Sequence, residues 1–389
     1  MTEAHAAIQR DLRVFISAAE PSADRHGATL IGATRALCPR AQFVGVAGPR
    51  MVEAGCERVF DMSGQAGMLL GALKAAGRAA KLLSTADERL RAEPFDACVV
   101  IDSPTLHLPL MKRAKAAGVP TLFYIAPQMW AWGTYRIHKL RDQVDAVAAI
   151  LPFEEPFFRG HGIDATFVGH PLAEQIAAET VDHAAIAAMR KSGNPMIAIL
   201  PGSRTHVVEE VLPGQLEVVA AIARALPGSA FGVPVASPRI GHVIDALVAR
   251  AGLTGRVVPR PHAELIRAAD LAIVASGTTA LEIAFHETPM IVMYNASRLF
   301  YHVVGRWMLH TKYLSLPNIL AGMQIVPEFM PYYRSTEPII QTALALLKDA
   351  DARQDMSRAL ANVVAPLREG SAARRTAELL ISIAKPPHR

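Results

Sequence analysis

The chain has 389 residues, of which 51% are hydrophobic and 19% are charged, and its formal net charge is +5 at pH 7. This length exceeds the size at which one hydrophobic core keeps growing, so we expect two domains. The composition excludes a disordered chain, and no apolar run approaches the ~20 residues that a membrane-spanning helix requires. The basic balance fits an anionic membrane surface or a phosphorylated substrate. No nucleic-acid partner is expected, because aromatic residues are few and are not interleaved with basic ones.

No export signal is expected at the start of the sequence. Residues 1–11 are polar and Ala-rich, and the apolar run that follows, 14–19, is too short for the core of a signal peptide. Cys38, Cys56 and Cys98 are an odd number without CxxC spacing, which indicates buried thiols in a reducing compartment. We therefore expect a cytoplasmic protein.

Short apolar runs alternate with longer Ala- and Leu-rich stretches, a pattern that predicts strands and helices in turn. In the first half, the predicted strands are Arg13–Ala18, Phe43–Ala47, Ala97–Ile101, Thr121–Ile125, Ala146–Leu151 and Thr166–Val168. The alternation restarts after a Gly- and Pro-containing break at Gly169–Leu172, with predicted strands Met196–Leu200, Ala230–Val235, Arg256–Val258, Leu271–Ala275 and Met290–Tyr294. The fold class is therefore α/β. Two Rossmann-like, doubly wound parallel-sheet domains, 1–172 and 173–389, are expected to face each other across a ligand cleft.

The segment Ala19–Asp24 follows the first predicted strand and precedes a helix, so it is a candidate ligand loop. Its polar side chains are Glu20, Ser22 and Asp24. The competing interpretation is that Ser22 or Asp24 caps the following helix, which is the commoner role for such residues.

The segment Met68–Leu83 predicts an amphipathic helix. Its apolar side comprises Leu69, Leu70, Leu73, Ala76, Ala80 and Leu83, and its basic flank comprises Lys74, Arg78 and Lys81. Two interpretations stay open: a helix packed on its own sheet with a basic rim, or a helix attached to an anionic bilayer. The candidates for lipid contact are Met68, Leu69, Lys74 and Arg78.

An acid follows the predicted strand Ala97–Ile101. Asp102 lies at the carboxyl end of that strand, where α/β active sites form, and could accept a proton from a substrate hydroxyl. A cap for the next helix is the alternative. Further along, Trp130 and Trp132 could wall a sugar or acyl cleft, with Arg136 facing a phosphate, or both rings could pack in the core. His170 is expected either to bond a ligand or to brace the hinge, and no second His or Cys stands at metal-ligand spacing.

Two polar turns in the second half, LPGSR at 200–204 and ASGTTALE at 275–282, each follow a strand and open a helix. Glycine lets the backbone approach a ligand, and the free N–H groups of a helix N-terminus favour a phosphate. Because Arg204 adds a fork-shaped charge, the pair predicts a nucleotide diphosphate ligand.

With these motifs in order, the chain resembles lipid-A-disaccharide synthases, glycosyltransferases of the two-domain GT-B architecture. The likeness is carried by FVGVAGPRM at 43–51, the Tyr124–Trp132 segment, LPFE at 151–154, VGHPL at 168–172, the two polar turns, KYLSLPNILAG at 312–322 and VPE at 326–328. These segments span almost the whole chain, and the Pro-x-x-Trp-Ala-Trp and Tyr-x-Ser-Leu-Pro-Asn tracts are specific.

The resemblance implies inverting transfer from UDP-2,3-diacylglucosamine to 2,3-diacylglucosamine 1-phosphate, with neither a metal nor another cofactor. It assigns the first domain to the acceptor and the second to the UDP-sugar, and leaves open a C-terminal helix packed on the first domain. It further implies an enzyme held peripherally at the anionic inner membrane, with a homodimer left open. Asp102 and Glu20 would be catalytic, and Ser22 and Asp24 would meet the acceptor. The nucleotide-sugar residues would be Ser203, Arg204, Ser276, Gly277, Thr278, Thr279, Glu282, Asn318 and Glu328.

Several positions depart from the family pattern. The family's GETSGD is AEPSAD here, and its IDxPDFN reads IDSPTLH, so Thr105 and His107 replace an acid and an Asn. Further family residues are replaced by Val207, Gly71 and Pro331. His107, or Glu209 and Glu210, are the candidates for compensation. The alternatives are a paralogue with another acylated or amino-sugar acceptor, a non-catalytic UDP-sugar or lipid-binding protein, and a UDP-N-acetylglucosamine epimerase.

Overall fold

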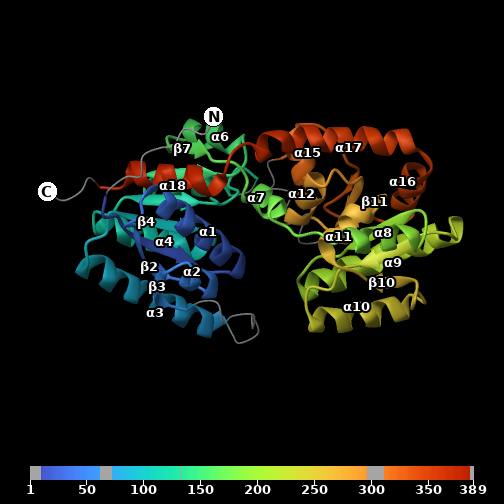
Figure 1. Ribbon diagram of the computed structural model, residues 1–389, viewed down its shortest axis with the longest axis horizontal. Coiled ribbons are helices and arrows are strands. Elements are labelled where there is room, and N and C mark those ends of the chain that lie inside the picture. Colours follow the sequence, from blue (N-terminus) through green and yellow to red (C-terminus); the bar gives the residue numbers. More distant parts are fainter. Residues whose placement is uncertain (1–9, 62–71, 132, 296–310, 386–389) are drawn as a thin grey trace. The chain divides into compact units, whose positions relative to one another are not determined.

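The computed structural model describes residues 10–61, 72–131, 133–295 and 311–385 (Figure 1). The chain forms two compact units, which differ from two consecutive halves. Unit 1 comprises Met1–Glu174 and Leu367–Arg389, and unit 2 comprises Gln175–Pro366. Each unit is built on one parallel sheet, which confirms the α/β class.

The sheet of unit 1 has the order β3-β2-β1-β4-β5-β6-β7. Its strands are β1 Arg13–Ala18, β2 Gln42–Val46, β3 Cys56–Phe60, β4 Ala97–Ile101, β5 Thr121–Tyr124, β6 Ala146–Ala149 and β7 Ala165–Phe167. The six strands predicted for this half are confirmed within about two residues at each end. The edge strand β3 was missed because its sequence, CERVF, places two charged residues in a run of five.

Helices cover both faces of this sheet. The helices of unit 1 are α1 Pro21–Leu37, α2 Pro49–Glu53, α3 Ala72–Ala92, α4 Pro104–Ala116, α5 Ile137–Arg141, α6 Glu154–Gly160 and α18 Ala372–Ile383, with the short 3-10 helix η1 Thr134–Arg136; α7 Pro171–Ala177 begins in unit 1 and ends in unit 2. Because side chains alternate along a strand, Val14 and Ile16 of β1 join a core with α1 and α18, whereas Phe15 joins one with α3 and α4. Figure 1 shows α18, in red, lying across α1, in blue.

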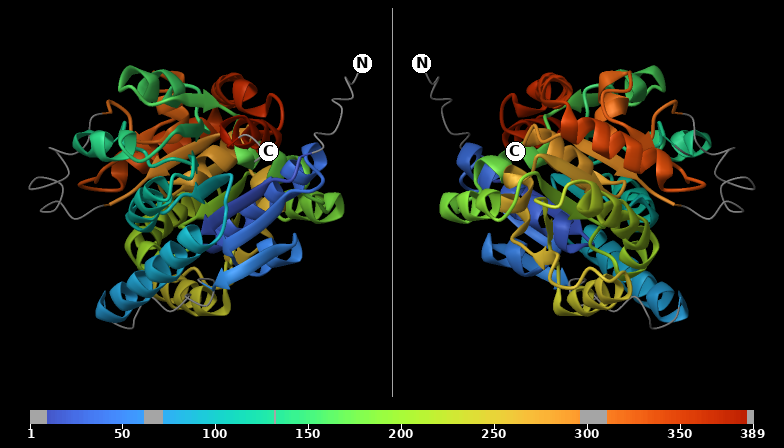
Figure 2. Two further views of the ribbon diagram at one scale, coloured as in Figure 1. Left: turned by 90° about the vertical axis from the view of Figure 1, so that its left-hand side faces the viewer. Right: turned by 90° about the vertical axis from the view of Figure 1, so that its right-hand side faces the viewer.

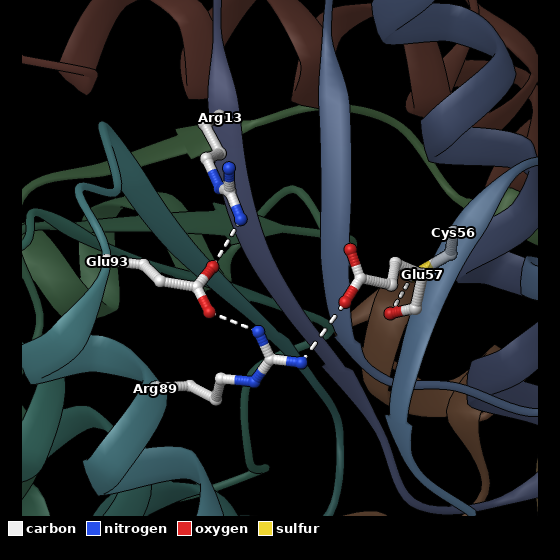
Figure 3. Close-up of polar contacts among 5 residues, drawn as sticks. All are labelled: Arg13, Cys56, Glu57, Arg89 and Glu93. Carbon is white, nitrogen blue, oxygen red and sulfur yellow. Dashed lines mark hydrogen bonds and ion pairs between the residues drawn. The ribbon is translucent and has the colours of Figure 1, made fainter.

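An ion-pair network links the end of α3 to β1 and β3, near the residues at which these strands begin (Figure 3). Glu93, just past the end of α3, pairs with Arg13 of β1 and with Arg89 of α3. Arg89 also reaches Glu57 of β3, with 3.2 Å between nitrogen and oxygen. The second half of α3, the long pale-blue helix of Figure 2, is therefore tied to two strands.

The sheet of unit 2 has the order β10-β9-β8-β11-β12-β13, again all parallel. Its strands are β8 Met196–Leu200, β9 Ala230–Val233, β10 Val257–Pro259, β11 Leu271–Val274, β12 Met290–Met293 and β13 Glu328–Phe329. All five predicted strands are present, although β9 ends two residues earlier than predicted. Strand β13 was missed because two residues carry no periodic signal.

The helices of unit 2 bury apolar faces against this sheet. They are α8 His183–Lys191, α9 Thr205–Ala225, α10 Pro238–Arg250, α11 His262–Ala268, α12 Thr278–Phe285, α15 Leu316–Ala321, α16 Glu337–Lys348 and α17 Ala350–Val364, followed by the 3-10 helix η3 Ala365–Arg368. Ile197 and Ile199 of β8 contact the core formed with α9, α10 and α16.

Each sheet has one point at which the chain changes the direction of winding. In unit 1 it lies between β1 and β4, and in unit 2 between β8 and β11. The loops after two such strands diverge to opposite faces and leave a crevice at the strand ends, where ligands of open α/β sheets bind. Functional residues are therefore expected at the carboxyl ends of β1 and β4 in unit 1 and of β8 and β11 in unit 2.

Candidate active site

The two polar turns of the second half meet at the switch point of unit 2. Leu200 of β8 pairs with Val274 of β11, and the Ala275 N–H donates to the Leu200 carbonyl at 2.9 Å. The turns that follow, 201–204 and 275–277, therefore start side by side. Sequence reasoning found both turns, and strand order supplies their adjacency.

Glycine is required in both turns by backbone conformation. Gly202 has a φ of +105° and Gly277 a φ of +141°, values that L side chains rarely adopt. A Cβ at Gly202 would lie 3.0 Å from a methyl carbon of Val207, whereas a Cβ at Gly277 would have no heavy atom within 4 Å. The Gly277 backbone thus lies beside open space that another group can enter.

Two helices, α9 and α12, begin at the carboxyl ends of β8 and β11. Arg204 is the N-cap residue of α9 and Gly277 that of α12, and neither helix has a side-chain cap. The N–H groups of their first turns are therefore open to an anion. Ser203, Arg204, Gly277 and Thr278 are exposed, and Ser276 and Thr279 are half-buried.

Glu282 lies one turn into α12 and is the predicted ribose ligand. Its Oε1 lies 2.9 Å from Nε2 of His262, the first residue of α11. Burial lowers the pKa of His262, but the hydrogen bond that its ring donates to Glu282 and the negative charge of that carboxylate outweigh burial, so the pKa lies above the usual value. The carboxylate is thus held in position from the neighbouring helix. His262 carried no signal in the sequence.

A second pair at this edge was also missed. The Tyr294 hydroxyl, which follows β12, donates to Glu210 Oε2 of α9 at 3.2 Å. Burial first, then Glu210, raises the pKa of Tyr294, while the Arg204 guanidinium acts in the opposite direction. The three side chains therefore form one electrostatic group. Glu210 is one of the two acids that could compensate for the family acid replaced by Val207, and here its carboxylate accepts a hydrogen bond from Tyr294.

Asn318 and Glu328 have a structural arrangement that the sequence did not reveal. Asn318 is 0% exposed, and its amide donates to the Val326 carbonyl and to Glu328. Its oxygen accepts from the backbone of Ile325 and Val326. Glu328 in turn accepts from the backbone and the hydroxyl of Ser315. The pair therefore fixes α15 and the segment before it to β13, and Asn318 has no open face for a nucleotide.

Glu20 and Asp102 lie at the switch point of unit 1, at the ends of adjacent strands β1 and β4. Glu20 is exposed at the N-cap position of α1, and Asp102 is half-buried. Asp102 has a φ of +56° and Ser103 a φ of +47°, an uncommon conformation for residues other than glycine. Asp102 does not cap α4, because Ser103 occupies the N-cap position.

Asp24 corrects the acceptor-binding prediction. Its side chain is 4% exposed and accepts the backbone N–H groups of Gly48, Arg50 and Met51 at 2.9 to 3.1 Å. Asp24 therefore caps α2 and does not present a carboxylate to a ligand. Capping of α1 by Ser22 or Asp24 is also wrong, because Glu20 holds that position and Ser22 is an exposed residue of the first turn.

Trp130 is packed rather than open. Its ring is 9% exposed, meets Phe153 edge-on at 4.7 Å between centroids, and donates its Nε1–H to Glu154 at 3.0 Å. Glu154 also accepts the backbone N–H groups of Ile150 and Leu151. Burial raises the pKa of Glu154 to about 7 despite these bonds. For Trp130, the core interpretation is thus confirmed. Trp132 lies outside the described residues, and Arg136 is exposed at the end of η1.

The membrane-facing candidates fall mostly outside the described part of the chain. Met68 and Leu69 lie outside it, as does the side chain of Lys74. Arg78 and Lys81 are exposed, and so is Ala80 of the predicted apolar side. The face that packs on the sheet comprises Leu82, Ala86 and Leu90. Leu83 of the predicted apolar side is partly buried against the same core, so the packed stripe agrees with the predicted one only in part. Among the described helices, none is long and apolar enough to cross a bilayer.

A buried histidine occupies the VGHPL turn. His170 is 8% exposed, and its Nδ1 accepts the Leu172 N–H at 3.2 Å. Burial, followed by the nearby His26, lowers the pKa of His170 to about 3. His26 meets the ring of Tyr124 edge-on at 6.4 Å. The Gly169–Leu172 turn is therefore held by a neutral imidazole within unit 1.

A groove of about 840 Å³ runs between α9 and α10, lined by Leu216, Ala220, Val243, Leu247, Glu217 and Arg250 among others. It lies along the flanks of the helices and not at the strand ends, so it is separate from the two turns. Within the described parts of the chain, no group of three or more His, Cys, Asp or Glu side chains is placed to hold a metal ion.

Comparison with solved structures agrees with this architecture. The S. aureus MnaA–UDP co-structure has a TM-score of 0.66 at 13% identity, with 97% of this chain and 100% of that chain covered. Acinetobacter baumannii MurG has a TM-score of 0.57 at 14% identity, with coverages of 95% and 99%. At these identities the likeness shows the fold alone, and that fold is the GT-B architecture of two parallel-sheet α/β domains.

Comparison with sequences is more specific. The family model for lipid-A-disaccharide synthetase matches residues 14–381. The lipid-A-disaccharide synthase of Trichlorobacter lovleyi is 36% identical over 379 residues, which cover 97% of this chain and 99% of that protein. That of Myxococcus xanthus is 33% identical over 376 residues, with coverages of 96% and 98%. The chain therefore belongs to the lipid-A-disaccharide synthase family, glycosyltransferases of lipid A biosynthesis.

Proposed function

We propose that this enzyme transfers the 2,3-diacylglucosamine unit of UDP-2,3-diacylglucosamine to the 6-hydroxyl of 2,3-diacylglucosamine 1-phosphate. The observation that carries the donor half is the pairing of β8 with β11, which brings two uncapped helix N-termini to one edge beside Arg204. Such N-termini bind phosphate. A UDP diphosphate placed there would bring its ribose toward Glu282, one turn further along α12.

In the proposed mechanism, unit 1 supplies the base. The Asp102 carboxylate removes the proton of the acceptor 6-hydroxyl as that oxygen attacks C1 of the donor sugar. The bond from C1 to the β-phosphate oxygen breaks with inversion, and both of its electrons leave with UDP. Glu20, at the end of the adjacent strand, is the second carboxylate of this edge and is proposed to bind or orient the acceptor, together with Ser22.

The negative charge that develops on UDP requires stabilisation where it forms. Arg204 presents a planar guanidinium that can bind two phosphate oxygens, and the amides of the 276–279 turn add oriented dipoles. These groups do not have to reorganise during the reaction. We therefore propose that the protein itself supplies this stabilisation, without a metal or another cofactor.

Access to acylated substrates is proposed to occur at the cytoplasmic face of the inner membrane. The basic side chains Arg78 and Lys81 are exposed on α3, as is Ala80. Leu82, Ala86 and Leu90 are buried and hold the helix to the sheet. A helix anchored in this way can present a basic face to anionic headgroups. Arg78→Glu with Lys81→Glu should reduce flotation with anionic vesicles and leave UDP affinity unchanged; equal flotation of both proteins would contradict this location.

The transfer is tested directly with purified protein, the UDP-linked diacyl donor and the monosaccharide phosphate acceptor. The expected result is one UDP released for each disaccharide phosphate formed, with no UDP release when the acceptor is omitted. If UDP binds but no disaccharide forms, a different acceptor or a non-catalytic role replaces this proposal. Isomerised sugar nucleotide in the absence of acceptor would indicate an epimerase.

A further inference from the structure

The turn that carries Asp102 adopts a conformation that needs support. Both Asp102 and Ser103 are left-handed, with φ values of +56° and +47°. A left-handed conformation is energetically unfavourable for a residue other than glycine, so it persists only where surrounding contacts hold it. The direction of the Asp102 carboxylate depends on this turn, so the contacts that hold the turn also set the position of the proposed base.

Two hydrogen bonds hold the main chain of Asp102. Its N–H donates to the Tyr124 carbonyl of β5 at 3.1 Å. Its carbonyl oxygen lies against Nδ1 of His107, a residue of the first turn of α4. On the other side of the ring, His107 Nε2 lies 2.9 Å from the hydroxyl of Ser17 on β1. One imidazole therefore connects β1, the Asp102 turn and α4.

The chemistry of these partners fixes the tautomer of His107. A carbonyl oxygen only accepts hydrogen bonds, so Nδ1 must carry the proton. The ring is 0% exposed, and burial lowers the pKa of His107 to about 4, with the bond to Asp102 acting against burial. The ring is thus neutral at pH 7, and the Ser17 hydroxyl donates to Nε2. Both ring nitrogens are occupied, so His107 has none left for a substrate.

We propose that His107 is a positioning residue for the transfer reaction. Its Nδ1–H holds the Asp102 carbonyl and thereby fixes the left-handed turn that presents the Asp102 carboxylate to the acceptor. This inference rests on the proposed function of Asp102.

Two substitutions separate this role from simple packing. His107→Asn keeps a donor at the position of Nδ1 and loses the contact with Ser17. His107→Gln keeps a polar group near Nε2 and loses the bond to Asp102. We expect His107→Asn to retain kcat close to the wild-type value. We expect His107→Gln to reduce kcat by about 10- to 100-fold, because small displacements of a reacting group have effects of this size. UDP affinity, which depends on unit 2, should be unchanged in both.

Equal losses of kcat in the two variants, or no loss in either, would overturn the proposal. The thermal unfolding midpoint of each variant shows whether it folds. A nitrogen NMR spectrum of the wild-type ring provides an independent test that needs no variant: protonated Nδ1 is expected, and protonated Nε2 would overturn the proposal. Failure of the proposed function looks different, because the wild-type chain itself would then form no disaccharide.

Discussion

Nε2 of His262 and Oε1 of Glu282 lie 2.9 Å apart, so the predicted ribose ligand is already bonded to a side chain of a neighbouring helix. A carboxylate has about four acceptor positions on its two oxygens, and one bond to imidazole leaves capacity for a ribose diol. His262 thereby restricts the rotamers of Glu282 before UDP arrives. Such preorganisation reduces the entropy that binding would otherwise cost.

Glu282→Gln is expected to weaken UDP binding by about 10- to 100-fold, because a hydrogen bond to a charged group contributes ~1.5 to 3 kcal/mol. Isothermal titration calorimetry with UDP measures the change. His262→Ala is the matched control, since it removes the protein partner and leaves the carboxylate for the ribose. Equal losses in the two variants would mean that Glu282 acts through His262 and not on UDP.

Arg204→Ala is expected to weaken UDP binding by a similar factor of about 10 to 100, because it removes a charge-assisted bond to phosphate. Arg204→Lys should recover only part of the affinity, since lysine keeps the charge but loses the fork. Arg224, exposed at the opposite end of α9, is the control: Arg224→Ala should bind UDP like the wild type. If all three variants bind UDP alike, the diphosphate lies elsewhere.

Asp102→Asn is expected to lower kcat by about 10²- to 10⁴-fold, the usual cost of losing a general base, and to leave UDP affinity unchanged. Initial rates of UDP release measure this effect. Glu20→Gln serves as the comparison on the adjacent strand and should act mainly on the KM of the acceptor. A large loss of kcat in Glu20→Gln, with little change in Asp102→Asn, would place the base after β1.

Acid is expected to destabilise the VGHPL turn through His170. Its pKa of about 3 in the fold lies below the usual value of about 6.5, so the unfolded chain binds a proton that the folded chain does not. The stability contributed by the neutral ring is complete above pH ~6.5 and is lost as pH falls toward 3. Between pH 7 and pH 5 this amounts to roughly 2 kcal/mol.

His170→Asn keeps an acceptor for the Leu172 N–H and removes the titrating ring. Denaturant unfolding at pH 7 and pH 5 should therefore show a smaller pH dependence in this variant than in the wild type. His242→Asn, which replaces an exposed histidine of α10, is the control. The same acid sensitivity in wild type and His170→Asn would assign the effect to other groups.

How much the sequence predicts differs between the fold and the site. The strands were predictable because buried parallel strands are continuous apolar runs, as in MIAIL at 196–200. Gly202 and Gly277 were predictable because few residues adopt their conformations. Asp24 was not, because whether a carboxylate caps a helix or binds a ligand depends on which backbone folds next to it. Its partners lie 24 to 27 residues away.

The same limit applies to His107, Glu154 and His262. Each bonds a side chain that the fold brings to it from 20 to 90 residues away: Ser17 for His107, Trp130 for Glu154 and Glu282 for His262. No local spacing encodes such pairs. The resemblance to the family pointed to residues at the carboxyl ends of β1, β4, β8 and β11. The structure then showed that Asp24 and Asn318, which were predicted to bind ligands, form hydrogen bonds with backbone groups instead.

The division of the chain also affects how the protein is made. Because 367–389 belongs to unit 1 and 175–366 forms unit 2, unit 2 is an insertion within unit 1. During synthesis from the N-terminus, unit 2 can close its core while unit 1 still lacks α18, whose Ala377 and Leu380 fill the space beside α1. A ribosome that stops before residue 372 therefore releases a chain with a complete unit 2 and a unit 1 whose apolar face is exposed to chaperones and proteases.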